Sequence, residues 1–132
     1  MTVQATGTFE VSSWDEETYQ ELAGGAKLTK ARVTFGFAGD LEAEGGWEAL
    51  MCYREDGTAD YTGLQRTVGK LAGREGSFVL RADGTFEGGE ARTSWQVVAG
   101  SATGELRGLR GTGSTVSAGG TGGTFAFDYE LD

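Results

Sequence analysis

Residues 41–68, LEAEGGWEALMCYREDGTADYTGLQRTV, decide the fold class of this chain. From Leu41 to Arg54, small or apolar side chains largely alternate with charged ones, and alternation of this kind is typical of a β-strand. Asp56-Gly57 is a strong signal for the tight turn of a hairpin. The residues from Thr58 to Val68 then form a returning strand. The stretch therefore predicts a pair of long antiparallel strands.

Outside this hairpin, 24 glycines fall between short alternating segments in a chain that also holds 14 aromatic residues (Phe 7, Tyr 4, Trp 3) and no proline. Many short strands with glycine-rich turns and bends are typical of an all-β sandwich or barrel. We expect the other strands at Val3 to Ser13, Lys27 to Ala38, Ser77 to Ala82, Thr85 to Glu87, Ala91 to Val98, Thr103 to Leu106, Gly111 to Ser117 and Thr124 to Leu131.

Loop-forming residues set the expected breaks between these strands. Residues 14–25 are expected to form a loop with at most one helical turn. Gly45-Gly46 is expected to interrupt its strand and could exchange its two faces, and Asp83-Gly84 is expected to close a second hairpin. About eight or nine strands result, in a single domain over residues 1–132. Strand counting alone leaves a sandwich and a barrel both open.

The composition excludes several kinds of catalytic site. The chain has no histidine and one cysteine, Cys52. A Ser-His-Asp triad, a Cys-His dyad, a histidine-based iron or zinc site and an intrachain disulfide are therefore excluded, and we expect neither a metal nor another cofactor. Without a histidine to lower its pKa, Cys52 is interpreted as a small core residue and not as a nucleophile.

Charge and the N-terminal sequence bear on partners and location. Acidic residues outnumber basic ones 20 to 11, which gives a net charge of −9. Nucleic-acid binders usually carry a basic face, so neither a nucleic acid nor an anionic membrane is an expected partner. The first residues contain neither a basic region nor an apolar run of the kind that signal peptides have. We therefore expect a cytoplasmic protein.

Strand alternation gathers large side chains on faces that could border a barrel interior. Trp47, Met51 and Tyr53 share one face of their strand. Aromatic side chains dominate most protein cores, so these residues could either fill the interior or line a cavity. The candidate binding residues on such faces are Trp47, Met51, Tyr53, Tyr61, Trp95 and Phe127.

Three charged residues are candidates for chemistry. Glu10 lies in an otherwise small and apolar strand, and a carboxylate buried there would have a raised pKa suited to acid–base work. Strand parity favours an outward Glu10, because Phe9 and Val11 then take the core side. Glu48 has the same two possible orientations. Arg66 could hold a carboxylate or a polarised oxygen if it faced inward, although the surface is the more usual place for arginine.

Several segments resemble a family of small bacterial proteins of unknown function that share the allene oxide cyclase-like barrel. They run in order through almost the whole chain, so the resemblance favours a barrel over a sandwich. The family often has proline at the position of Ala26 and histidine near Ala82. The matching segments are SWDEETY from Ser13, GGAKLT from Gly24, FAGDLE from Phe37, YREDGTA from Tyr53, GSFVL from Gly76, GTFEGG from Gly84, TGELRGLRG from Thr103 and FDYEL from Phe127.

The wider superfamily looks like a set of cofactor-free barrels, including plant allene oxide cyclases, dirigent proteins and bacterial spiro-ring cyclases. Such enzymes control the folding of a reactive apolar substrate largely by positioning it. Residues 8–12, TFEVS, are similar to the first strand of the plant cyclases, which implies cavity-facing roles for Glu10 and Ser12.

Three functional hypotheses result. The first is a cofactor-free cyclase or isomerase that acts on a polyketide- or oxylipin-like molecule. The second is a barrel that binds a small hydrophobic molecule without turnover. The third is a packed barrel that serves as an oligomeric interaction module. The resemblance implies a homodimer or homotrimer under all three.

Overall fold

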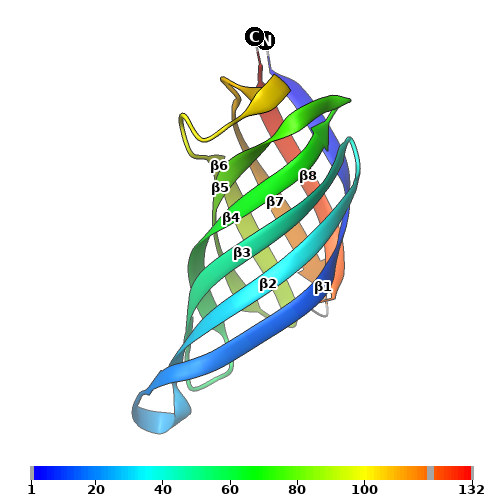
Figure 1. The fold of residues 1–132 in the computed structure, drawn as a ribbon. Coiled ribbons are helices and arrows are strands. Elements are labelled where there is room, and N and C mark those ends of the chain that lie inside the picture. Colours follow the sequence, from blue (N-terminus) through cyan, green and yellow to red (C-terminus); the bar gives the residue numbers. More distant parts are fainter. Residues whose placement is uncertain (1, 119–120, 132) are drawn as a thin grey trace.

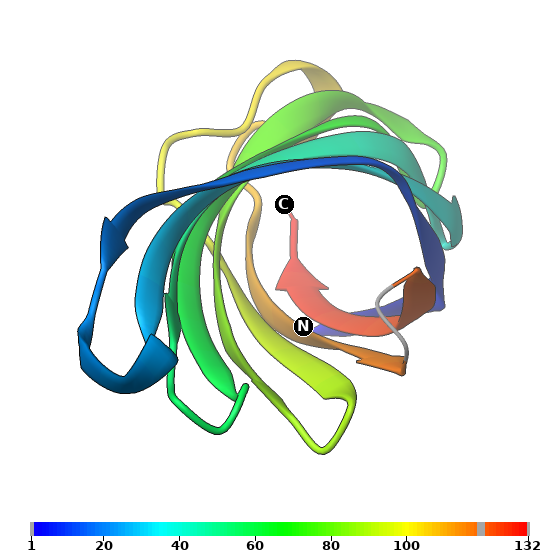
Figure 2. The same ribbon diagram turned by 90° about the horizontal axis from the view of Figure 1, so that it is seen from below.

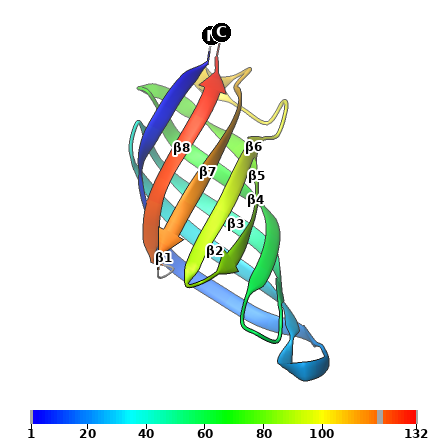
Figure 3. The same cartoon turned by 180° about the vertical axis from the view of Figure 1, so that it is seen from behind.

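A computed structural model of the protein describes residues 2–118 and 121–131. Each strand pairs antiparallel with the next, and the last pairs with the first, so that the sheet closes into a barrel (Figures 1 and 3). The predicted all-β, antiparallel barrel of about eight strands is confirmed. The strands are β1 (Val3–Glu21), β2 (Lys27–Gly39), β3 (Leu41–Tyr53), β4 (Ala59–Leu71), β5 (Arg74–Glu87), β6 (Glu90–Val97), β7 (Arg110–Ala118) and β8 (Gly122–Glu130).

Several strands are longer than the sequence predicted. β1 continues to Glu21 and pairs with β2 over this extension, so residues 14–19 are strand and not loop. The only helical piece in that region is the 3-10 turn η1 (Ala23–Gly25). The acidic, polar composition of the extension concealed the strand, because most of its side chains are exposed on a protruding hairpin (Figure 1).

Two predicted breaks are also wrong. β3 is continuous through Gly45-Gly46 and keeps its faces, because both glycines remain in register with β2 and β4. β5 likewise runs unbroken through Asp83-Gly84, which pairs with strands on both sides instead of forming a turn. Residues 104–106 form a 3-10 turn, η2 (Gly104–Leu106), and not a strand.

Cys52 is exposed on the outer face of β3, so its interpretation as a core residue is wrong.

Glycines inside the strands leave room for aromatic rings. A Cβ on Gly63 would lie 2.7 Å from Nε1 of Trp47 and would also clash with the backbone carbonyl of Glu48. A Cβ on Gly84 would lie 2.8 Å from the hydroxyl of Tyr61. Both distances are too short for a methyl group. The glycines therefore set how closely the indole and phenol rings approach the barrel wall.

The two ends of the barrel differ. At the end that holds both termini, the segment between β6 and β7 folds over the opening and inserts two leucines, Leu106 and Leu109, which are buried (Figure 1). Its backbone is held by hydrogen bonds from Thr103 to Ser77 and from Val98 to Val79. The opposite end carries the connections from β1 to β2, from β3 to β4 and from β5 to β6 (Figure 2). In the part of the chain described, no helix is long and apolar enough to span a membrane.

Candidate binding pocket

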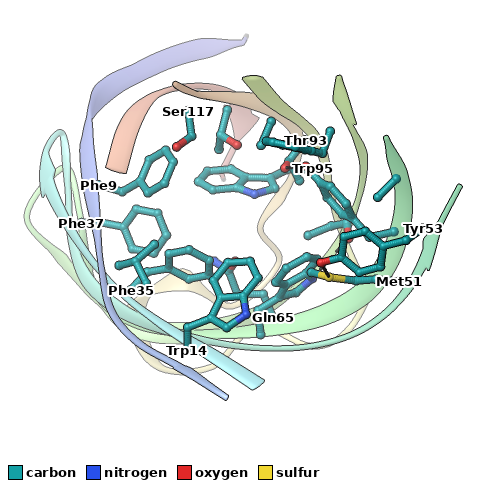
Figure 4. A pocket seen from close by; sticks show the side chains of 18 residues that line it. Phe9, Trp14, Phe35, Phe37, Met51, Tyr53, Gln65, Thr93, Trp95 and Ser117 are labelled. Carbon is teal, nitrogen blue, oxygen red and sulfur yellow. Dashed lines mark hydrogen bonds between the residues drawn. The ribbon is translucent and has the colours of Figure 1, made fainter. Parts of the chain in front are cut away.

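The interior near the hairpin end is hollow. A cavity of about 250 Å³ lies there, among side chains of strands β1 to β7 (Figure 4). Half of the lining side chains are aromatic and none is charged. The lining residues are Phe9, Val11, Trp14, Phe35, Phe37, Trp47, Met51, Tyr53, Ala59, Tyr61, Gln65, Ala82, Phe86, Ala91, Thr93, Trp95, Thr115 and Ser117.

Ring-on-ring packing holds the aromatic walls in place. Phe37 meets Trp95 edge to face with ring centroids 5.6 Å apart. Trp47 meets Tyr61 in the same way at 5.2 Å. These distances and angles fall within the favourable range for aromatic pairs. The rings support one another from different strands, so the cavity is a preformed feature of the barrel and does not depend on one side chain.

Most polar groups at the wall are already bonded to the protein. The indole N–H of Trp47 donates to the backbone carbonyl of Ala82 at 3.3 Å. The hydroxyl groups of Tyr61 and Thr93 lie 2.8 Å apart and share a hydrogen bond. Burial raises the pKa of Tyr61, although the Thr93 contact opposes this, so Tyr61 is a neutral phenol near neutral pH.

A β-bulge determines which residues reach the rim of the pocket. The pairing of β1 with β2 shifts by one residue between Val11 and Ser13, which reverses the inward-facing parity of the strand as far as Thr18, where the pairing shifts again. Trp14 then lies opposite the buried Val33 and contributes to the pocket. Glu16 follows on the same face and is brought to the rim. Without the bulge, both side chains would point away from the barrel.

Glu16 is the centre of a hydrogen-bonded cluster at this rim. Its carboxylate accepts hydrogen bonds from Thr29 at 2.6 Å, from Tyr53 at 2.8 Å and from the indole of Trp14 at 2.9 Å. The ammonium group of Lys27 lies 5.2 Å from the centre of the Tyr53 ring. The cluster therefore ties the extended β1–β2 hairpin to β3.

The cluster fixes the protonation of its members. Partial burial on its own would raise the pKa of Glu16, but the hydrogen bonds from Thr29, Tyr53 and Trp14 and the charge of Lys27 outweigh it and lower that pKa. Burial, followed by the hydrogen bond to Glu16 and its charge, raises the pKa of Tyr53. Glu16 is thus a carboxylate and Tyr53 a neutral phenol near neutral pH, and neither is poised to exchange a proton.

The structure brings five of the predicted binding residues together at the cavity: Trp47, Met51, Tyr53, Tyr61 and Trp95. Phe127 is fully buried but lies in the packed part of the core, where it meets the rings of Phe78 and Trp95. Ser12 lies outside the barrel, with its hydroxyl 2.6 Å from that of Thr34. The inward role that the resemblance implied for Ser12 does not agree with this geometry.

The three charged candidates lie on the outer surface. Glu10 and Arg66 are exposed, and Glu48 forms a surface ion pair with Arg32. The physical reason is strand parity, since each alternates with inward neighbours such as Phe9 and Trp47. A catalytic role inside the barrel required these side chains to face inward, so the geometry corrects that prediction for Glu10, Glu48 and Arg66.

Sequence reasoning missed other members of the pocket. Parity along β2 could have found Phe35 and Phe37, and parity along β4 could have found Gln65, which shares the face of Tyr61. Trp14 and Glu16 had no comparable signal, because their orientation depends on the bulge.

Among the described residues, no group of three or more acidic or cysteine side chains is arranged to hold a metal ion.

Comparison with known proteins places this barrel in a family. Residues 5–129 match the family model described as "Protein of unknown function (DUF3224)". The chain belongs to this family. A crystal structure of a DUF3224 protein from Shewanella oneidensis, itself of unknown function, is similar over 100% of this chain and 99% of its own, with 33% sequence identity and a TM-score of 0.84. No curated protein matches the chain significantly.

The DUF3224 membership agrees with the closed barrel but assigns no ligand. The match covers all eight strands of this chain, including the long first hairpin that forms one side of the pocket rim. The pocket itself is therefore the feature that points to a function.

Proposed function

We propose that this DUF3224 protein binds a small, mostly apolar molecule inside the barrel and does not transform it. The observation that supports this proposal is the cavity of about 250 Å³ with aromatic walls and no charged lining residue. Apolar cavities in proteins stay free of water and can hold apolar guests; one of about 150 Å³ holds benzene. The size therefore fits a molecule of two fused rings.

Binding without turnover fits the positions of the ionisable groups better than cyclase or isomerase chemistry does. Acid–base catalysis needs a group within hydrogen-bond reach of the substrate and a pKa near the working pH. Glu10, Glu48 and Arg66 lie outside the barrel. Glu16 is at the rim, where three donors already occupy its carboxylate and lower its pKa.

Calorimetric titration with naphthalene tests this proposal. At about −0.5 kcal/mol per heavy atom, a bicyclic hydrocarbon would bind with roughly −5 kcal/mol, which corresponds to a Kd on the order of 0.1–1 mM. The heat-capacity change should be negative because apolar surface is buried. Native mass spectrometry of the protein purified under mild conditions should in addition reveal a co-purified neutral molecule.

Two variants of β6 locate the binding site. Ala91 lines the pocket near the open end, so Ala91→Phe should fill the entrance and abolish naphthalene binding. Ser94→Phe introduces the same ring on the exposed outer face of that strand and should leave binding intact. Equal binding by both variants, or no binding by the unmodified protein, would refute the proposed function.

A further inference from the structure

Among the described residues, three buried polar side chains at the pocket wall keep an atom that no protein group binds: Trp95 on β6, Gln65 on β4 and Thr115 on β7. The two largest, Trp95 and Gln65, are 4% and 2% exposed. Both side chains line the cavity. Neither polar atom is sealed off from the cavity, so whatever occupies the cavity is the available hydrogen-bond partner for both.

The indole nitrogen of Trp95 is the first of these groups. Trp47, the other buried tryptophan, donates its N–H to the carbonyl of Ala82. Within residues 2–118 and 121–131, the N–H of Trp95 donates to no protein acceptor. Figure 4 shows its indole nitrogen directed toward the open centre of the pocket. An indole N–H can only donate, so its ligand partner must be an acceptor.

The carboxamide of Gln65 is the second group. Its nitrogen donates to the hydroxyl of Thr67 at 3.2 Å. Across the described part of the chain, the amide oxygen has no protein partner. Gly45 leaves space for this side chain, since a Cβ there would lie 3.0 Å from the amide nitrogen. The carboxamide thus has free hydrogen-bonding capacity at the wall.

The charge distribution excludes anions from the same site. None of the lining residues carries a charge, so a charged ligand would lose its hydration without compensation. At the rim, the ammonium group of Lys27 offsets the carboxylate of Glu16, so the rim does not attract an anion either. Aromatic walls on several sides favour flat rings, which can stack or meet edge to face.

We infer that the ligand is a neutral, flat compound of about two fused rings that carries a carbonyl oxygen, which the indole N–H of Trp95 binds, while Gln65 takes a second polar group. This inference rests on the proposed function and names its ligand class. Among compounds of the same size, the pocket would therefore bind those with matching polar groups more tightly. Purely apolar molecules would also bind, but without hydrogen bonds to Trp95 or Gln65.

A pair of probes that differ in one polar group tests the inference. Naphthalene and coumarin are similar in size and shape, but coumarin carries a ring carbonyl. Calorimetry would give the Kd of both for the unmodified protein and for Trp95→Phe. Because one hydrogen bond changes affinity by about two- to ten-fold, Trp95→Phe should weaken coumarin about five-fold more than naphthalene.

Trp47→Phe is the matched control, because the indole N–H that it removes donates to the backbone carbonyl of Ala82 and not to a ligand. It should change the Kd of both probes by the same factor, with folding checked by circular dichroism. Gln65→Met, which keeps the length but removes the amide, should weaken 2-naphthol selectively over naphthalene. The anion 2-naphthoate should bind at least ten-fold more weakly than naphthalene.

The outcomes separate the inference from the proposed function. If naphthalene binds but Trp95→Phe affects both probes equally, the pocket is real and the carbonyl site is refuted. Tighter binding of 2-naphthoate than of naphthalene would overturn the neutral ligand class. If none of the probes binds, both the proposed function and this inference are wrong.

Discussion

Replacing Gly63 by alanine should destabilise the barrel by about 3 kcal/mol. The new Cβ would lie 2.7 Å from Nε1 of Trp47 and 2.9 Å from Cα of Ala49, and it would clash with a backbone carbonyl. Overpacking of this kind costs about 1–3 kcal/mol. Displacement of the indole would also break its hydrogen bond to Ala82, which adds about 1–3 kcal/mol for the unpaired buried groups.

Urea unfolding followed by tryptophan fluorescence would measure this change, with Gly46→Ala as the matched control. Gly46 lies on the outer face of β3, where an added Cβ meets no atom within 4 Å. That substitution should change the unfolding free energy by no more than about 0.5 kcal/mol. If the two variants were equally stable, glycine would not be setting the approach of Trp47 to the wall, and the shape of the pocket would need another explanation.

Three further predictions concern the closed end, the rim and the outer face. Leu106→Ala should lower the unfolding free energy by about 3 kcal/mol, because it empties a fully buried site, yet leave naphthalene affinity unchanged in calorimetry. For Glu16, the lowered pKa means that its carboxylate stabilises the fold above pH 4.5 and loses this effect as the pH falls through the native pKa. The stability difference between the unmodified protein and Glu16→Gln, measured in urea, should therefore shrink below pH 4.5, and a gap that widened would contradict this sign. Glu10→Gln should leave both the unfolding midpoint and naphthalene affinity unchanged, because Glu10 is exposed outside the barrel.

Alternation along the sequence predicted much of the wall. In β3, Trp47, Met51 and Tyr53 share the inner face as expected, and Trp95 of β6 also faces inward. Alternation succeeds there because these strands keep a regular register with both neighbours. The inward face of a regular strand follows directly from its sequence.

Strand alternation could not predict the residues at the pocket rim or the presence of a cavity in the interior. A one-residue bulge near Ser12 reverses the faces of β1 from Ser13 to Thr18, and its position leaves no pattern in a polar sequence. The sequence also does not show whether a glycine forms a turn or lies inside a strand. At Gly57 it forms a turn, whereas at Gly84 it lies in a continuous strand and makes room for Tyr61. Whether aromatic side chains fill or line an interior depends on how they pack together.

A crystal structure of the protein grown with saturating naphthalene would show directly whether the barrel holds a ligand. The expected result is a flat ligand inside the barrel at the hairpin end, in contact with Phe37, Trp47 and Trp95, with the wall residues in the positions described above. An interior filled by repacked side chains, or naphthalene bound only on the outer surface, would contradict it.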